Sequence, residues 1–184
     1  EWQSILELHK KSKLQDLPEI THRVAQAACE YANELFKKGD YLDSHQYLKL
    51  ALRINPLCAR ANILFAQVAS NQGEPKEAIR CYLKALKQDS NAMLAVLPDM
   101  MKCFIKTDDY KGLDKQLESH WQSNHAVEVL VARVKLLAQQ GRQQYGIEVL
   151  LTELFQHPSN QGFFALVEMV VNEKAVLNSS QLMS

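Results

Sequence analysis

The 184-residue sequence has no excess of positive charge, because 21 Lys and Arg residues balance 21 Asp and Glu residues. A nucleic-acid-binding protein normally carries a basic excess that displaces counterions from the phosphates. Binding to an anionic membrane surface likewise uses a polybasic segment. The charge balance therefore predicts that the chain has no nucleic-acid partner and no polybasic membrane-binding region.

Long apolar runs and closely paired cysteines are also missing. No run of about 18 apolar residues occurs, so we expect no segment of this chain to insert into a membrane. The four cysteines (Cys29, Cys58, Cys81 and Cys103) form no CxxC pair, which excludes a zinc ribbon or a thioredoxin-like motif. Cysteines scattered in this way are typical of reduced thiols that fill a core, and they favour a cytoplasmic protein.

Two pairs of reactive side chains are candidates for a chemical site. His120 and His125 are five residues apart, a spacing that does not place two metal ligands on one helical face. Cys29 and His22 are seven residues apart, which on one helix separates a nucleophile from its base by about 10 Å. Solvated turn histidines and a core cysteine explain these residues better.

The remaining candidates give no catalytic group either. Asp108 and Asp109, near Asp114, fall in a predicted turn, where carboxylates cap the N-terminus of a helix. The six glycines are isolated, so no glycine-rich loop is present to bind a phosphate. The sequence therefore predicts a protein that is not an enzyme and holds neither a metal ion nor a cofactor.

The clearest positive signal is an internal repeat of 34 residues. This offset separates Gly39 from Gly73, and two further periods lead to Gly141, with the turn at Thr107 between them. Apolar residues recur at helical spacing between the turns, and no alternation typical of strands occurs. Glycine at a turn permits the left-handed conformation that ends a helix. Each period therefore predicts two amphipathic helices joined by a turn.

The repeat resembles the tetratricopeptide repeat, with Ser44 where that family prefers Ala and Ser90 in place of Pro. Its consensus is matched by Tyr31, Ala32, Gly39, Tyr41, Ala51 and Pro56, and again by Phe65, Ala66, Gly73, Ala78, Tyr82 and Ala85. The resemblance implies an all-α fold, a right-handed α-solenoid of helical hairpins. Tyr110 stands one residue late, which predicts a local insertion in the third repeat.

We expect the whole chain to form a single array that is cut at both ends. Its predicted parts are a half-repeat at 1–20, repeats at 25–58, 59–92, 93–126 and 127–160, and a half-repeat at 161–178. Pro56 and Pro158 fall where the second helix of a repeat should stop. Ala78 and Ala85 should lie buried between the two helices of the second repeat.

Several short segments also resemble the family of bacterial lipopolysaccharide assembly protein B. They are residues 1–3, 28–32, 55–61, 77–80, 100–104 and 157–159. The resemblance implies an adaptor with cytoplasmic repeats, in a parent with a membrane anchor and a rubredoxin-like zinc ribbon. Such adaptors restrain lipopolysaccharide synthesis, working with a membrane ATP-dependent protease that degrades the pathway's deacetylase. Two alternatives stay open: the repeat region of a glycosyltransferase, and a co-chaperone module that binds peptide tails.

In tetratricopeptide repeats the first helix of each hairpin lines a concave groove that binds a protein or peptide. The family's inward-facing positions, 9 and 13 of that helix, correspond to Asn33 and Lys37, Gln67 and Asn71, Met101 and Ile105, and Lys135 and Gln139. Arg60 is added because its guanidinium group can bind a carboxylate. The alternative is that these residues are ordinary solvated side chains, with Met101 and Ile105 in the core.

Overall fold

The computed structural model describes residue 4 and residues 18–172, and within these ranges it contains helices and turns but no strand. The helices are α2 (Pro18–Lys37), α3 (Tyr41–Ile54), α4 (Ala59–Asn71), α5 (Pro75–Gln88), α6 (Met93–Lys106), α7 (Tyr110–Asn124), α8 (Val127–Gln139), α9 (Gln143–Gln156) and α10 (Asn160–Asn172). A short 3₁₀ turn, η2 (Ser90–Ala92), precedes α6. The predicted all-α fold is confirmed.

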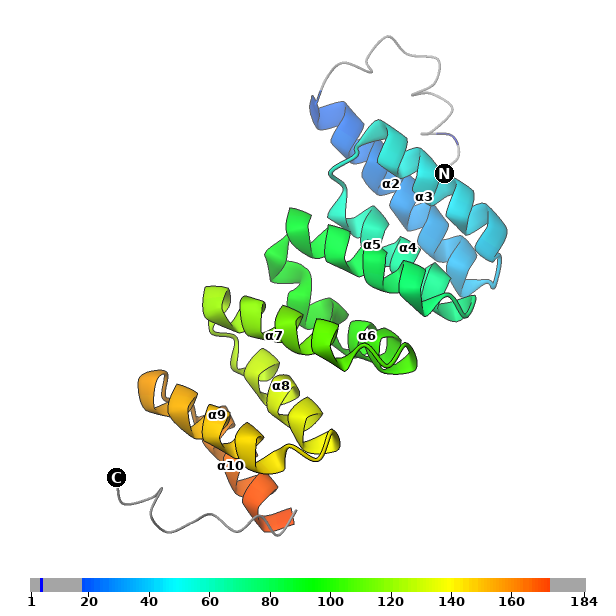
Figure 1. Ribbon diagram of the computed structural model, residues 1–184. Helices are drawn as coiled ribbons and strands as arrows, with labels where there is room; N and C mark the ends of the chain where they lie inside the picture. Colours follow the sequence, from blue (N-terminus) through cyan, green and yellow to red (C-terminus); the bar gives the residue numbers. More distant parts are fainter. Residues whose placement is uncertain (1–3, 5–17, 173–184) are drawn as a thin grey trace. The chain divides into compact units, whose positions relative to one another are not determined.

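The chain forms two compact units, one ending at Asp108 and the other beginning at Asp109. In the first unit, α2 pairs with α3 and α4 pairs with α5, and α4 also packs against α2, α3 and α6 (Figure 1). In the second unit, α8 packs against α7 and α9, and α10 packs against both α8 and α9. The boundary falls at the turn inside the expected repeat 93–126.

The predicted glycine turns adopt the left-handed conformation. The φ angles are 82° at Gly39, 79° at Gly73 and 72° at Gly141. No atom would meet a Cβ at these three positions, so the backbone conformation rather than space is what favours glycine there. The next helix begins two residues after each glycine, at Tyr41, Pro75 or Gln143.

The third turn contains no glycine, and Asp108 takes the left-handed position with a φ of 56°. This position comes one residue after Thr107, because α6 has 14 residues where α4 has 13. The next helix accordingly starts at Tyr110, which confirms the predicted insertion. Asp109 caps that helix as expected, since its Oδ1 accepts a hydrogen bond of 2.9 Å from the Gly112 amide.

The first described helix differs from the expected boundaries. α2 begins at Pro18, so residues 18–20 belong to it and not to the expected half-repeat 1–20, and it starts well before residue 25. Proline fits the first turn of a helix, where its missing N–H has no acceptor within the helix, and Glu19 is favourable there. The rest of that half-repeat, apart from residue 4, lies outside the described residues, as do residues 173–178.

Small side chains fill the contacts between paired helices. Ala78 and Ala85 on α5 are completely buried, as predicted. Ser44, at the place of Ala78 in the preceding repeat, is also completely buried, and its hydroxyl donates a 2.8 Å hydrogen bond to the Ala32 carbonyl. The departure from the family's alanine therefore leaves no unpaired hydroxyl.

The second unit contains two ion pairs to one buried arginine that the sequence pattern did not predict. Arg133 on α8 is buried, and its guanidinium group donates to Asp114 at 2.7 Å and to Glu118 at 2.9 Å, both on α7. Asp114 thus belongs to a helix–helix contact rather than to the acidic turn with which it was grouped. The two carboxylates hold the pKa of Arg133 above its ordinary value, although burial opposes them.

We expect Ala85→Leu to lower the free energy of unfolding by roughly 1–3 kcal/mol, because the added methyl groups have no room between the helices. Ala95→Leu is the matched control, since Ala95 is exposed on α6. Urea denaturation monitored by circular dichroism measures both. An unchanged midpoint for Ala85→Leu would show that the helix does not pack tightly at this residue.

Candidate partner-binding site

A cleft of about 350 Å³ lies in the first unit where α2, α4 and α6 meet. Its lining comprises Asn33, Phe36 and Lys37 from α2, Gln67, Ser70 and Asn71 from α4, Tyr82 from α5, and Asp99 from α6. The first helices of successive hairpins pack side by side, which brings side chains from distant parts of the sequence into one cleft.

Internal contacts hold several of these side chains in place. The Asn71 side-chain amide nitrogen donates a 2.9 Å hydrogen bond to the main-chain carbonyl of Gln67. The Ser70 hydroxyl accepts from the Cys103 thiol at 3.4 Å. Asp99 forms a 3.0 Å ion pair with Lys102, one turn further along α6. The cleft thus offers fixed amide, hydroxyl and carboxylate groups together with the Lys37 ammonium group.

Tyr82 is the unusual member of this lining. Its side chain is 1% exposed, and its hydroxyl group is buried without a hydrogen-bond partner. Burial raises the pKa of Tyr82, and the nearby Asp99 carboxylate raises it further, so the hydroxyl stays protonated. Buried polar groups are nearly always hydrogen-bonded, and an unpaired one costs roughly 1–3 kcal/mol.

Four of the nine expected groove residues line this cleft: Asn33, Lys37, Gln67 and Asn71. The two expected residues of the third repeat, Met101 and Ile105, lie on α6 but do not line this cleft. Met101 is half-buried, and Ile105 is 37% exposed. The pairing of Met101 and Ile105 with the polar positions therefore stays a prediction.

The remaining expected residues lie elsewhere. Arg60, at the start of α4, forms a 3.3 Å ion pair with Glu30 on α2. Lys135 and Gln139 are exposed on α8 in the second unit, and Lys135 lies 3.5 Å from the Glu168 carboxylate.

Sequence reasoning missed Tyr82 and Asp99 as members of the cleft. Tyr82 matched a consensus position of the repeat, and that match gives no sign that the residue lines a cleft. Asp99 had a readable signal, because it is the only carboxylate in the apolar helix from Met93 to Lys106. A charged side chain is almost never fully buried unless it is paired, so such a carboxylate is expected at a surface or in an ion pair.

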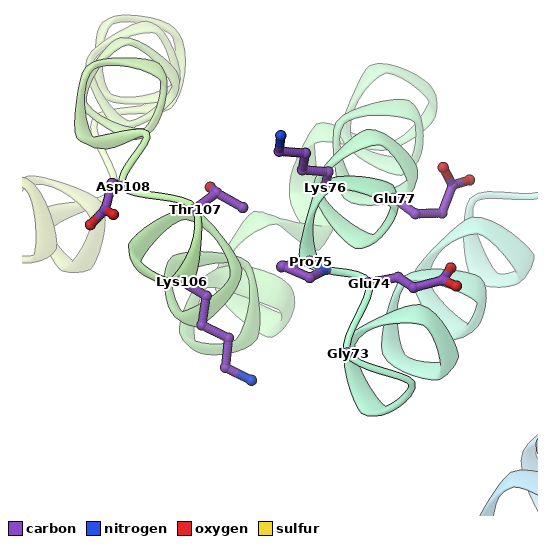
Figure 2. A pocket seen from close by; sticks show the side chains of 8 residues that line it. All are labelled: Gly73, Glu74, Pro75, Lys76, Glu77, Lys106, Thr107 and Asp108. Carbon is purple, nitrogen blue, oxygen red and sulfur yellow. The ribbon is translucent and has the colours of Figure 1, made fainter.

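A second hollow, of about 670 Å³, lies at the turns of the same unit. Figure 2 shows the segment from Gly73 to Glu77 on one side and the segment from Lys106 to Asp108 on the other. The charged ends of Lys76, Glu77 and Lys106 point in three different directions (Figure 2). Because these charges do not converge, the hollow offers no defined set of ligand-binding groups.

His125 and Cys29 each contact a residue other than the partner that the sequence suggested. The His125 ring stacks on His157 with centroids 4.0 Å apart, and the Trp121 ring packs edge-on against His125. Cys29 lies beside Cys58, with 3.8 Å between the two sulfur atoms.

The described residues also meet neither the requirements of a metal site nor those of a membrane-spanning helix. Across residue 4 and residues 18–172, no three His, Cys, Asp or Glu side chains are grouped as metal ligands. In the same part of the chain, no helix combines the length and the apolar character that crossing a bilayer requires.

The helical hairpins and glycine turns define a class of protein, and a family comparison agrees with it. Residues 35–111 match the family model described as tetratricopeptide repeat, so this part of the chain consists of tetratricopeptide repeats.

The chain is similar in sequence to lipopolysaccharide assembly protein B of Haemophilus influenzae (strain ATCC 51907 / DSM 11121 / KW20 / Rd). The two are 22% identical over 173 residues, which cover 94% of this chain and 43% of that protein. The chain thus spans less than half the length of this relative.

A solved structure supports the fold. The structure described as the functional characterization of Pseudomonas aeruginosa pilF has a TM-score of 0.58 and 20% sequence identity. The match covers 84% of this chain and 71% of that chain. At this level of identity the likeness establishes the helical-repeat fold alone.

We expect Tyr82→Phe to leave the free energy of unfolding unchanged or to raise it, because the lost hydroxyl has no partner in the protein. Tyr82→Ala is the control for packing and should cost roughly 3–5 kcal/mol, the usual range for removing a buried aromatic ring. Urea denaturation measures both variants. A loss above about 1 kcal/mol for Tyr82→Phe would mean that the hydroxyl is hydrogen-bonded within the protein.

Proposed function

We propose that the chain is a non-catalytic adaptor that binds a segment of a partner protein in the cleft between α2, α4 and α6. The observation that carries the proposal is the unpaired hydroxyl of Tyr82 in a cleft lined by amide groups. A peptide main chain offers both carbonyl acceptors and N–H donors. It can therefore pair with Asn33, Gln67 and Asn71, while one of its acceptors satisfies Tyr82.

The balance of charges in the cleft supports a partner segment of mixed polarity. Lys37 contributes a positive charge from α2 and Asp99 a negative charge from α6. A strongly acidic or strongly basic peptide would meet repulsion from one of them. Phe36 adds an aromatic surface against which an apolar side chain of the partner can pack.

The sequence relative supports a role in lipopolysaccharide synthesis. We propose that the partner is the pathway's deacetylase or a component of the membrane ATP-dependent protease that degrades it. The adaptor would act on the cytoplasmic side and present the enzyme to the protease. Neither catalytic residues nor a cofactor are part of this proposal, since positioning two proteins requires only binding surfaces.

The co-chaperone alternative fits the first repeat less well. Receptors of that kind bind a terminal carboxylate with a lysine at the position held here by Cys29. Cys29 is completely buried beside Cys58 and offers no positive charge. The nearby Arg60 is already paired with Glu30. A free acidic C-terminus would therefore lack a clamp at this end of the cleft.

The test is a double variant, Asn33→Ala with Lys37→Glu, which removes one hydrogen-bonding group and reverses one charge on the α2 side of the cleft. Asn33 and Lys37 both line the cleft. We expect at least a tenfold loss of affinity for the purified deacetylase, which corresponds to about 1.4 kcal/mol. Calorimetric titration measures the affinity.

The matched control is Lys38→Glu. Lys38 is exposed directly after α2, so this variant makes the same change of charge outside the cleft. Its affinity should equal that of the unmodified protein, and all variants should keep their helical circular-dichroism signal. Unchanged affinity in a folded double variant would exclude the cleft as the binding site.

A further inference from the structure

Cys29 and Cys58 form a buried pair of thiols that links the first two hairpins. Cys29 lies in the middle of α2, and Cys58 is the residue that immediately precedes α4. The two sulfur atoms are 3.8 Å apart, and neither is in a disulfide. The cysteines are 29 residues apart in the sequence, so only the packing of α2 on α4 brings them together.

We propose that this pair is an oxidative modification site, at which Cys58 reacts with a hydroperoxide and Cys29 then closes a disulfide between α2 and α4. The inference does not rest on the proposed function, because it concerns the reactivity of the thiols and needs no partner protein.

The surroundings of Cys58 favour its thiolate. The hydrogen bond with Cys29 lowers the pKa of Cys58, and the backbone amides of Ala61 and Arg60 and the charge of His22 lower it further. The N-terminal end of a helix stabilises a negative charge, as it does for other reactive cysteines. Burial opposes this effect without reversing it.

The two thiols are suited to different steps. Cys58 is 6% exposed and Cys29 is 0% exposed, so a small oxidant reaches Cys58 first. The pKa of Cys29 is raised by the hydrogen bond with Cys58 and by burial, which keeps Cys29 protonated until Cys58 has reacted. This order makes Cys58 the attacking thiolate and Cys29 the thiol that resolves the product.

The chemistry is balanced with hydrogen peroxide as the oxidant. The Cys58 thiolate attacks one peroxide oxygen, an S–O bond forms, the O–O bond breaks, and the departing hydroxide takes up a proton to become water. The Cys29 sulfur then displaces hydroxide from the Cys58 sulfenic acid, and the Cys29 proton leaves with it as a second water molecule. Two electrons pass from the two thiols to the peroxide.

The geometry leaves a short movement for this closure. A disulfide requires the sulfur atoms to approach to about 2.05 Å, so the present separation must shrink by less than 2 Å. Rotation about the Cα–Cβ bonds moves sulfur atoms by such distances.

The other two cysteines provide internal controls. Burial and the neighbouring Glu77 raise the pKa of Cys81 to about 11, and its thiol donates to that carboxylate at 3.7 Å. Cys103 is completely buried and donates to Ser70. Both should react more slowly than Cys58, whose thiolate is stabilised.

The experiment follows each cysteine of the folded chain by mass spectrometry. Iodoacetamide should alkylate Cys58 about tenfold faster than Cys81 at neutral pH. Alkylation of Cys58 should also continue at a pH so low that an ordinary thiol is almost fully protonated and unreactive. Hydrogen peroxide should remove two hydrogen atoms from the intact mass. A tryptic digest without reductant should then contain the peptide 24–37 joined to the peptide 54–60.

Variants separate the two roles. Cys29→Ser should accumulate a Cys58 sulfenic acid that dimedone traps, whereas Cys58→Ser should give neither the adduct nor the disulfide. Cys81→Ser with Cys103→Ser should form the disulfide as the unmodified chain does. Equal alkylation rates of Cys58 and Cys81 in the unmodified chain, or a cross-link that forms only in urea, would overturn the proposal even if a variant failed to fold.

Discussion

The close approach of paired helices is the constraint on which the first unit depends. Ala28 and Ala32 on α2, Ala51 on α3 and Ala85 on α5 are all completely buried. A methyl side chain keeps apolar surface at the contact while letting two helix axes come near each other. Because each hairpin is held tightly in this way, α2, α4 and α6 can pack in sequence and present one continuous lining. The cleft is a consequence of that packing.

Features of the fold that depend on one residue and its neighbours in the chain could be predicted from the sequence. The turns at Gly39, Gly73 and Gly141 were predictable because glycine adopts the left-handed conformation without a steric penalty. The insertion was predictable because Tyr110 stands one residue late in the repeat. The start of α2 was not predictable in the same way, since Pro18 is as compatible with a first helical turn as with a connection. In the cleft, the family positions gave Asn33 and Gln67. Tyr82 and Asp99 come from other helices, and their placement needs the tertiary packing.

Two buried polar side chains show why it matters for function whether a polar group finds its hydrogen-bond or ion-pair partner inside the protein. Arg133 forms ion pairs with two carboxylates on the neighbouring helix, so the cost of burying its charge is offset inside the second unit. Tyr82 has no such partner although it is also buried. A matched group such as Arg133 stabilises one arrangement of helices, and breaking the match is what costs free energy. A buried polar group without a partner, such as the Tyr82 hydroxyl, instead leaves a hydrogen bond that a ligand can form.

The thiol pair and the cleft share α2 because of the way a helix turns. Cys29, Asn33 and Lys37 are spaced by four residues, and four residues rotate the side chain by about 40° beyond a full turn. Along this row the side chains pass from completely buried, through half-buried, to exposed. One row therefore begins against the core at Cys58 and ends at the mouth of the cleft. A covalent bond at its buried end would restrain the position of α2 relative to α4, and those are the helices that carry most of the cleft's polar groups.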